Sequence, residues 1–557
     1  MSVTSMVAVP RLLLKFAIGG IIAVSISSGP NYAVAEGRPN ILLIVADDMG
    51  YSDWGGFGGE IRTPNLDELA EQGTRFTQFY TAPTCSPARA ALLTGIDQHL
   101  VGLGVMSELL APNQLGKPGY EGYINDRAPT VAQLLSDSGY ATMMSGKWHL
   151  GDEIEHDPSR KGFEKSFTML NGGTSHFGDE WMMYANYTPL YREDGRRTHV
   201  PPDFYSSQFY TQKIIDWLEE KEDERPFFAY LAFTAPHDPL HVPEDWLGRY
   251  SGVYDLGYDE LREQRLASMR ELEIIADDAV ASPRPPFVPG WDSLTPEQQK
   301  RPARSMEIYA SMIENLDQHV GRLINMLKEK DLYESTLIMF LSDNGANGWT
   351  MDRYPGTDQA WVERNSDNRY ENFGRRGSRL AVGPGWALTS MTPFRMFKTF
   401  ISEGGVRVPM IVAGPGVSGE GRISHAVADG RDIAPTILDF AGVQQPKEYA
   451  GHSVLPIQGK SMISHLAGES GSVHGQEHTI GFEFVGWRAI RAGDMKATWI
   501  HKPYGKSRWE LFDLASDPGE TRDLSAERPD ELGRLEKLWD TYADRVGVVM
   551  PDRRADE

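Results

Sequence analysis

The sequence predicts an α/β fold: a large, mostly parallel mixed sheet flanked by helices, followed by a small α+β domain with an antiparallel sheet. Two observations predict it. Apolar runs of strand length end abruptly in polar residues and alternate with helical patterns, as in parallel sheets that helices cover on both faces. Beyond about residue 450 the pattern changes to short alternating runs separated by turns, which is typical of antiparallel strands.

The first 35 residues have the pattern of an export signal. Arg11 and Lys15 supply positive charge before an apolar run over residues 16–26. Ala33-Val34-Ala35 then forms a small-residue cleavage site. We therefore expect a mature chain that starts at Glu36 and a protein that is periplasmic or secreted. The alternative is an uncleaved membrane anchor, but the apolar run is shorter than the ~20 residues that a span requires, so no stable membrane insertion is expected.

Composition narrows the classes of function. The chain of 557 residues carries 55 Lys and Arg against 78 Asp and Glu, a formal charge of −23. This balance argues against nucleic acid as a partner, because phosphate contacts need clustered cations. Cys85 is the single cysteine, so an internal disulfide is excluded. A lone thiol in an exported protein is either buried and inert or kept for its chemistry.

Four apolar runs are the candidate strands of the large sheet. In such sheets the ligand crevice lies beyond the carboxyl ends of the strands, so the polar residues that follow each run should converge on one edge. The runs and their polar ends are 40–46 before Asp47-Asp48, 142–145 before Gly146-Lys147, 227–235 before Pro236-His237, and 336–342 before Asp343-Asn344.

Helical patterns and one long irregular segment lie between these runs. A helix is predicted over residues 64–73, from a proline in its first turn to a glycine at its end. Residues 256–330 are charged and helical in period, and we expect them to form an excursion packed outside the sheet. Residues 348–390 lack a period, and because a loop of this length is usually functional, we expect a lid or a wall of the substrate site. This segment contains Trp349, Trp361 and Trp386.

The carboxyl-terminal part forms the small domain. We expect a signal peptide over 1–35, a catalytic α/β domain over 36–448 and an antiparallel α+β domain over 449–557. Residues 487–492 and 495–500 flank Gly493-Asp494, which predicts a hairpin. An amphipathic last helix is predicted by one apolar stripe, made of Leu532, Leu535, Trp539, Tyr542 and Val546.

The acidic strand ends suggest a metal site. Asp47 and Asp48 facing Asp343 and Asn344 bring three carboxylates and an amide oxygen into one crevice, and so many anions cannot stay ionised together without a counter-charge. An all-oxygen set suits a hard divalent cation such as Ca²⁺ or Mg²⁺, whereas zinc favours His or thiolate. The alternative is that these aspartates cap helix N-termini.

Cys85 is placed at the start of a predicted helix that ends at Gly95. At a helix N-terminus, backbone N–H groups and the helix dipole attract an anion, and Arg89, one turn further, points to the same side. This pattern indicates a nucleophile beside an oxyanion site. An inert buried cysteine is the alternative.

Several further cationic and imidazole groups follow strand ends. Lys147 and His149 are one residue apart, so they would face the same way in an extended stretch. His237 lies in a rigid turn between two prolines; a capping or surface role is the alternative for either histidine. His237 and His241 have the spacing of a zinc pair, without a nearby strong third ligand. Lys398, taken alone, is expected to be a solvated surface lysine.

At these residues the chain closely resembles the sulfatase family within the alkaline-phosphatase-like superfamily, and most nearly the broad-specificity bacterial arylsulfatases. The likeness extends to Leu511-Phe512-Asp513-Leu514 and Asp517-Pro518-Gly519-Glu520, so it covers essentially the whole mature chain. Six ordered motifs carry it: Ala46-Asp47-Asp48-Met49-Gly50, Cys85-Ser86-Pro87-Ala88-Arg89 with Leu92-Leu93-Thr94-Gly95, Gly146-Lys147-Trp148-His149-Leu150-Gly151, Ala235-Pro236-His237, Ser342-Asp343-Asn344-Gly345, and Glu403-Gly404-Gly405-Val406-Arg407-Val408-Pro409.

The resemblance implies a sulfuric ester hydrolase that cleaves aryl or alkyl sulfate monoesters to an alcohol or phenol and sulfate. Its Cys-x-Pro-x-Arg element implies that a maturation enzyme converts Cys85 to formylglycine (3-oxoalanine), whose hydrate attacks sulfur and is regenerated. The implied Ca²⁺ ligands, with Mg²⁺ possible, are Asp47, Asp48, Asp343 and Asn344.

The same resemblance implies the roles of the other groups. Asp343 would also activate the attacking hydroxyl. His237 would protonate the leaving oxygen, and His149 would deprotonate the remaining hydroxyl. The sulfate would be held by Arg89, Lys147 and Lys398.

Two other functions compete with this prediction. A phosphonate monoester or phosphodiester hydrolase of the same superfamily can share the metal ligands and the modified residue, although Lys147, His149 and Lys398 favour sulfate. The second is an exported, non-catalytic calcium-binding protein, against which the complete set of chemical groups argues.

Overall fold

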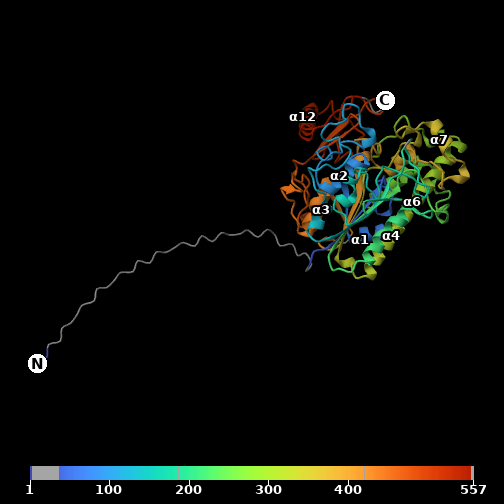
Figure 1. Cartoon of the computed structure of the whole chain (residues 1–557). Helices are drawn as coiled ribbons and strands as arrows, with labels where there is room; N and C mark the ends of the chain where they lie inside the picture. The colour runs from blue at the N-terminus through green and yellow to red at the C-terminus, as the bar shows by residue number, and fades with distance from the viewer. Residues whose placement is uncertain (3–36, 186, 420, 553–557) are drawn as a thin grey trace. The chain divides into compact units, whose positions relative to one another are not determined.

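A ten-stranded mixed sheet is the largest element of the computed structural model (Figure 1), which describes residues 1–2, 37–185, 187–419 and 421–552. The expected signal peptide and its cleavage site lie outside the described residues. The strands follow the order β10-β2-β9-β8-β1-β7-β3-β4-β5-β6. Neighbours are parallel from β8 to β4 and between β10 and β2, whereas β9, β5 and β6 run antiparallel to their neighbours. The predicted fold class is therefore confirmed.

The strands of this sheet include the four predicted apolar runs. All residues of the four strands concerned, β1, β3, β7 and β8, are buried, as expected of strands that are covered on both faces. The bounds are β1 Asn40–Asp47, β2 Thr74–Tyr80, β3 Ala141–Lys147, β4 Lys165–Met169, β5 Tyr191–Glu193, β6 Arg196–Thr198, β7 Phe227–Pro236, β8 Thr336–Ser342, β9 Arg407–Ala413 and β10 Arg422–Asp429.

The register aligns the polar ends of the central strands. β1 lies between β7 and β8, with Ala46 opposite Ser342 and Asp47 opposite Pro236. The backbone N–H of Asp343 donates to the Ala46 carbonyl oxygen at 3.1 Å. The acidic end of β1 is thereby held beside the acidic end of β8 at one edge of the sheet, as the sequence predicts.

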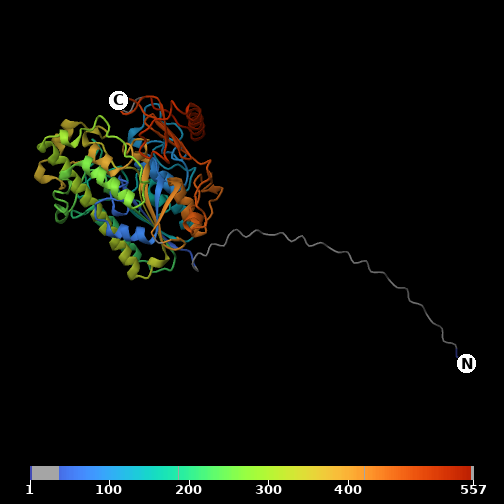
Figure 2. The same ribbon diagram turned by 180° about the vertical axis from the view of Figure 1, so that it is seen from behind.

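Helices cover both faces of the sheet, as two opposite views show (Figures 1 and 2). Their bounds are α1 Pro64–Gln72, α2 Cys85–Thr94, α3 Val131–Asp137, α4 Ser206–Glu219, α5 Tyr258–Glu271, α6 Pro296–Glu329, α7 Gln359–Asn365, α8 Pro384–Ser390, α9 Glu403–Val406, α10 Ile433–Ala441, α11 Ile463–Leu466 and α12 Pro529–Val546.

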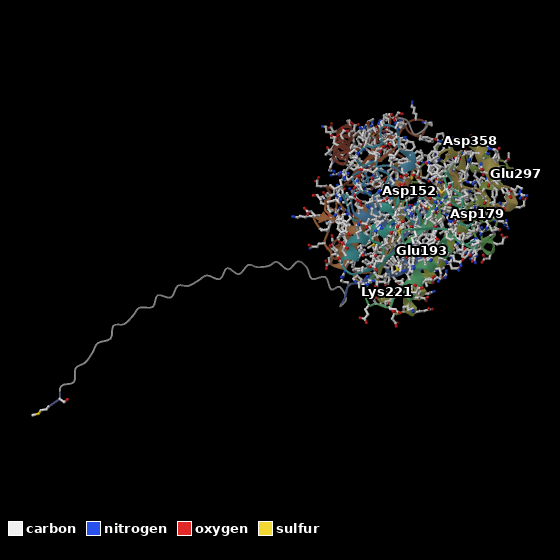
Figure 3. All side chains as sticks on the ribbon, viewed as in Figure 1. Asp152, Asp179, Glu193, Lys221, Glu297 and Asp358 are labelled. Carbon is white, nitrogen blue, oxygen red and sulfur yellow. The ribbon has the colours of Figure 1, made fainter. Side chains whose placement is uncertain are left out.

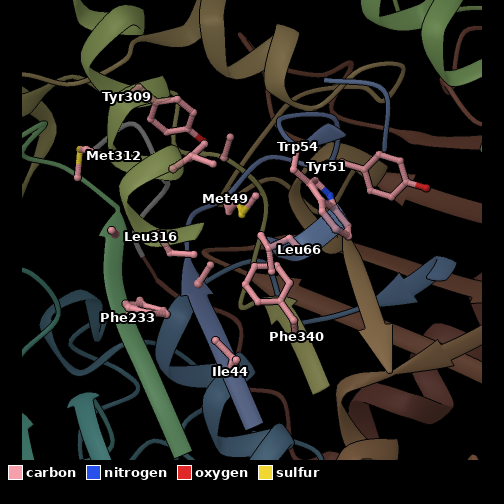
Figure 4. Packing of buried hydrophobic residues seen from close by; sticks show 14 of the residues in the cluster. Ile44, Met49, Tyr51, Trp54, Leu66, Phe233, Tyr309, Met312, Leu316 and Phe340 are labelled. Atoms are coloured by element: carbon pink, nitrogen blue, oxygen red, sulfur yellow. The ribbon is translucent and has the colours of Figure 1, made fainter. Parts of the chain in front are cut away.

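The longest of these helices, α6, is not the outlying excursion that its charged sequence suggests. It packs against α4, α1 and β7, and its residues Tyr309, Met312 and Leu316 enter the core beside Ile44 of β1 and Phe340 of β8 (Figure 4). Its apolar residues recur at helical spacing and form one buried face. The charged residues occupy the other face, which is why the segment as a whole has the composition of a surface element.

The segment over 348–390 is an irregular wall with the short helices α7 and α8. Of its three tryptophans only Trp349 lines the cavity described below. Trp361 stacks on Arg379, and Trp386 is buried against Tyr254, Tyr258 and Trp291. The wall expected here is thus built by the first part of the segment, near residues 349–357.

The carboxyl-terminal part contains a separate antiparallel sheet in the order β13-β14-β15-β16, with bounds Thr479–Phe484, Trp487–Ala492, Met495–Trp499 and Trp509–Asp513. The predicted hairpin is the β14–β15 pair. Helix α12 packs on this sheet through buried Leu535, Trp539, Tyr542 and Val546. The domain boundary near residue 448 stays a prediction. Among the described residues, no helix combines the length and apolarity that a membrane crossing demands.

Candidate active site

The acidic end of β1 lies at the centre of the site. The Asp48 backbone N–H donates to Asp343 Oδ1 at 3.2 Å, and Asn344 Nδ2 donates to Asp48 Oδ1 at 2.6 Å. Asp48 has a positive φ of 65°, a conformation that aspartate tolerates better than most residues. Asp47, Asp48, Asp343 and Asn344 are all buried. The structure therefore brings together the four residues that the sequence assigns to a metal.

Three buried cations balance the three carboxylates. Lys147 Nζ lies 2.8 Å from Asp47 Oδ2, Lys398 Nζ lies 2.8 Å from Asp48, and Arg89 Nη2 lies 2.8 Å from Asp343 Oδ2. Burial disfavours the charge of each cation, but the neighbouring carboxylates outweigh it and raise the pKa of Arg89, Lys147 and Lys398.

Lys398 is not the solvated surface lysine that its own sequence context suggests. It is 5% exposed, and its backbone N–H donates to the carbonyl oxygen of Ala346 at 2.9 Å. The turn that carries it runs beside the loop after β8, so the ammonium group reaches Asp48.

Cys85 is the first residue of α2, as predicted, and lies between the carboxylates and a lysine. Its Sγ is 3.5 Å from Asp47 Oδ1 and 3.3 Å from Lys398 Nζ. Burial raises the pKa of the Cys85 thiol, an effect that Lys147 and Lys398 only partly oppose. The unmodified thiol is therefore protonated at neutral pH and is a poor nucleophile.

Two histidines approach the same centre. His237 Nε2 lies 3.3 Å from Asp48 Oδ2, and its Nδ1 is 2.7 Å from the Asp238 carbonyl oxygen. Burial and the lysines lower the pKa of His237 to about 4. His149 follows β3 with a positive φ of 56°, so the stretch from Lys147 is not extended, contrary to expectation; both residues still face the site because the chain turns.

The structure contradicts two alternatives, helix capping by the aspartates and a zinc pair formed by His237 and His241. Neither Asp47, Asp48 nor Asp343 is the N-cap of any helix in the described ranges. His241 accepts from the His176 N–H and bonds to the Ser378 carbonyl oxygen, so it does not pair with His237 on a metal.

The donor set fits a hard divalent cation. The Oδ1 atom of Asn344 is buried and has no hydrogen-bond partner, although an unmet buried acceptor costs about 1–3 kcal/mol. The amide nitrogen of the same side chain donates to Asp48 Oδ1, so the amide lies beside a carboxylate, and oxygen atoms are the ligands that Ca²⁺ and Mg²⁺ prefer. Ligand atoms of Asp47, Asp48, Cys85 and His237 all lie within 4.8 Å of one another. The site can therefore hold a metal ion.

A cavity of about 430 Å³ opens above these groups. It is lined by Cys85, His149, His237 and Lys398 at its base, and its walls are largely aromatic: Tyr184, Trp349, Tyr354, Phe484, Trp487 and Tyr504. Side chains of β13, β14 and the loop after β15 thus complete a cavity whose base belongs to the large sheet.

The negative charge of the protein surface does not exclude an anionic ligand from this cavity. Exposed acidic residues such as Asp152, Glu297 and Asp358 (Figure 3) are screened by salt beyond ~8–10 Å.

A larger cavity of about 820 Å³ lies along β10, away from these groups. At its edge His474 bonds to Asp432 at 2.8 Å and His478 bonds to Asp429 at 3.0 Å. The two imidazoles stack with centroids 3.5 Å apart and planes at 10°, so one ion cannot lie in both ring planes. This cluster is a set of satisfied hydrogen bonds that attaches the chain before β13 to the end of β10.

Sequence reasoning missed the neighbours of the two histidines. Glu108 bonds to His149, and Asp238, whose pKa burial and Asp48 raise to about 8, bonds to Asn347 and Tyr354. Glu108 lies in a short 3-10 helix with no motif around it, so no sequence signal identifies it. Asp238 directly follows His237 and could have been noted for that reason.

The comparisons with known proteins agree with this geometry. The family model described as Sulfatase matches residues 39–443, and a model described as N-sulphoglucosamine sulphohydrolase, C-terminal, matches residues 394–538. The chain is similar to an arylsulfatase of Klebsiella aerogenes, with 42% identity over 78% of this chain and 94% of that protein. It is also similar to an uncharacterized sulfatase of Schizosaccharomyces pombe, with 41% identity over 92% of this chain and 95% of that protein.

Solved structures support the fold. The PsFucS1 sulfatase of Pseudoalteromonas sp. is similar with a TM-score of 0.59 and 21% identity over 91% of this chain and 90% of that one. A protein crystallised with its substrate D-glucosamine-2-N,6-O-disulfate is similar with a TM-score of 0.61 and 21% identity over 93% of this chain and 100% of that one. With the family model covering most of its length, the chain belongs to the sulfatase family, whose members hydrolyse sulfate esters.

Proposed function

We propose that the protein is an exported sulfatase of arylsulfatase type, which cleaves aryl or alkyl sulfate monoesters at residue 85. One observation carries the proposal: Arg89, Lys147 and Lys398 are buried around Cys85 at the base of a cavity with aromatic walls. Buried cations bind an anionic group strongly. Aromatic walls suit an apolar or aromatic leaving group.

The residues present fit the two groups that sulfatases use. Ca²⁺, with Mg²⁺ possible, would be held by Asp47, Asp48, Asp343 and Asn344, and formylglycine would be formed from Cys85 by a maturation enzyme. When present, these groups supply a fixed positive charge and an attacking hydroxyl. The buried, unpartnered Asn344 Oδ1 supports the metal, and the Cys-x-Pro-x-Arg element at residues 85–89 supports the modification.

The chain's own residues would perform the binding and the proton transfers. The ammonium groups of Lys147 and Lys398 would turn from Asp47 and Asp48 to the sulfate oxygens, while Arg89 holds Asp343 in position to accept a proton. His237 would donate a proton to the leaving oxygen, and the negative charge of bound sulfate would raise its pKa, which burial and the lysines lower in the structure. His149 would accept the proton that regeneration releases.

Substrate preference tests the proposed activity. We expect the native protein to cleave nitrophenyl sulfate faster than a nitrophenyl phosphonate monoester, with peptide mass spectrometry showing an aldehyde or its hydrate at residue 85. Faster phosphonate cleavage would identify a phosphonate monoester or phosphodiester hydrolase instead. An unmodified Cys85 in native protein without turnover would identify a non-catalytic, calcium-binding protein.

Metal removal tests the cation. Chelation should reduce turnover of nitrophenyl sulfate by about 100-fold or more, because the fixed charge that stabilises the sulfate is lost. Adding Ca²⁺ back should restore turnover, and Zn²⁺ should not, because the ligand set is all oxygen. Full activity after exhaustive chelation would contradict the proposed metal site.

Export is part of the proposal. The charged start, the apolar run over 16–26 and Ala33-Val34-Ala35 support a cleaved signal and a periplasmic or secreted protein. Amino-terminal sequencing of the protein from its host should begin at Glu36. A chain that begins at residue 1 or 2 in the membrane fraction would indicate an uncleaved anchor.

A further inference from the structure

Glu108 forms a buried pair with His149. It belongs to the 3-10 helix η2, Ser107–Leu109, and both of its carboxylate oxygens face the imidazole: Oε1 lies 3.1 Å and Oε2 3.4 Å from His149 Nε2. The two side chains are 6% and 7% exposed. No motif of the sequence contains Glu108, and the proposed function gives it no role.

The carboxylate itself is fixed from a second side. Tyr184 donates its hydroxyl to Glu108 Oε1 at 3.0 Å. The backbone of Gly172 lies against the same three groups, so that a Cβ there would approach the Tyr184 hydroxyl, His149 Cε1 and Glu108 Oε1. The fixed carboxylate of Glu108 therefore faces one nitrogen of the His149 imidazole, which is Nε2.

The pairing decides which nitrogen of His149 carries a hydrogen. A carboxylate accepts hydrogen bonds and donates none, and both oxygens of Glu108 face Nε2. Nε2 therefore carries a hydrogen, and in the neutral form of the ring Nδ1 keeps its lone pair. Nδ1 is buried and has no hydrogen-bond partner.

We infer that Glu108 is the positioning residue of His149, which holds the imidazole with its Nδ1 lone pair free for a proton from the group at residue 85. His149 and Cys85 line the same cavity, and the positive φ of His149 is a strained conformation that a functional constraint explains. The inference rests on the proposed role of His149 as a proton acceptor.

Oε1 of Glu108 is the oxygen that both Tyr184 and His149 Nε2 contact, at 3.0 Å and 3.1 Å. Glu108→Gln keeps a carbonyl oxygen at this position and should leave the original tautomer in place. Glu108→Leu removes the acceptor with little change in size, so Nε2 loses the partner that fixes its hydrogen and both tautomers of His149 should be populated.

The tautomer is measured directly by NMR of ¹⁵N-histidine-labelled protein, with unmodified Cys85 so that no maturation is required. The His149 signal is assigned by its loss in His149→Gln. We expect Nδ1 without hydrogen in the wild type and in Glu108→Gln, and a mixture of the two tautomers in Glu108→Leu. The same single tautomer in all three proteins would overturn the inference.

Kinetics of the matured enzyme provide the second readout. Glu108→Leu should lower kcat for nitrophenyl sulfate by about 100-fold or more with KM within about twofold, and Glu108→Gln, which keeps the acceptor oxygen, should recover most of the loss. Asp152→Asn is the control for a nearby change of charge, because Asp152 is exposed and does not line the cavity, and it should leave kcat near the wild-type value.

The outcomes separate this inference from the proposed function. A loss of kcat in Glu108→Gln equal to that in Glu108→Leu would attribute the effect to the charge of Glu108 and overturn the positioning role. A raised KM with unchanged kcat in Glu108→Leu would also overturn it. Matured wild-type protein that lacks sulfatase activity, but shows the expected tautomers, would refute the proposed function and retain the Glu108–His149 pairing.

Discussion

Replacing different residues at the base of the cavity should change the free energy of unfolding by different amounts. A substitution tests the chemistry only where this loss of stability is small. Arg89 is fully buried with two hydrogen bonds or ion contacts to Asp343, so its loss would leave an unpaired buried carboxylate and cost about 3–5 kcal/mol of stability. Cys85 accepts and donates only long contacts. Its removal should therefore affect chemistry without unfolding the protein.

The Cys85→Ala variant should lose turnover of nitrophenyl sulfate by a factor of about 10⁴ or more, because no other side chain supplies the nucleophile. Thermal unfolding followed by circular dichroism should give a midpoint within a few degrees of the wild type, since the change removes about one heavy atom's worth of packing. Retained activity in a folded Cys85→Ala protein would contradict the role of residue 85.

At the scale of elements, the register of β3 against β7 places Lys147 in the site. Gly146 lies opposite Ala232 with φ of +118°, and a Cβ there would collide with the Ala232 carbonyl oxygen. Gly146→Ala should therefore destabilise the protein by about 3 kcal/mol or more, as strain and overpacking add. Urea unfolding monitored by fluorescence measures this loss.

A second glycine beside the same strand provides the control. Gly139 also has a positive φ, +88°, but a Cβ there meets no atom within 4 Å. Gly139→Ala should cost only about 1 kcal/mol, the backbone term alone. Equal losses in the two variants would show that the close approach of β3 to β7 does not matter.

Some elements of the fold could be predicted from the sequence, and others could not. The four apolar runs, the helix over Pro64–Gln72 and the β14–β15 hairpin were predictable, because periodicity and turn residues are local signals. The position of α6 and the true surroundings of Lys398, Trp361 and Trp386 were not, because composition and spacing do not report which face of an element packs against another. The role of Glu108 could not be predicted either, because its partner His149 lies 41 residues away in the sequence.

For the molecule as a whole, the buried charge of His99 links the loop after α2 to the small antiparallel sheet. His99 Nδ1 lies 3.0 Å from Asp97 Oδ1 after α2, and its Nε2 lies 3.7 Å from Glu483 of β13. Asp97 also accepts from Tyr542 of α12 at 2.9 Å. Burial opposes the charge on His99, but the two carboxylates outweigh it and raise its pKa to about 9 from 6.5.

A raised histidine pKa makes stability depend on pH in one direction. The folded state binds the His99 proton more tightly than the unfolded state, so this contribution, about 3 kcal/mol, is complete below pH 6.5 and is lost as pH rises through 9. Urea unfolding between pH 6 and 10 should show the decline. His99→Gln should be less stable at pH 6 and should flatten this part of the profile; an unchanged slope would refute the assignment.

The burial of Cys85 sets an order of events during biosynthesis. The thiol is 1% exposed and lies beneath Lys398, and β8 and β9, which flank the site, come from residues 336–413, long after residue 85 in the chain. The proposed maturation enzyme could therefore reach this cysteine only before the sheet is complete. Under that proposal folding and maturation compete, and the late synthesis of β8 and β9 provides the time in which Cys85 is accessible.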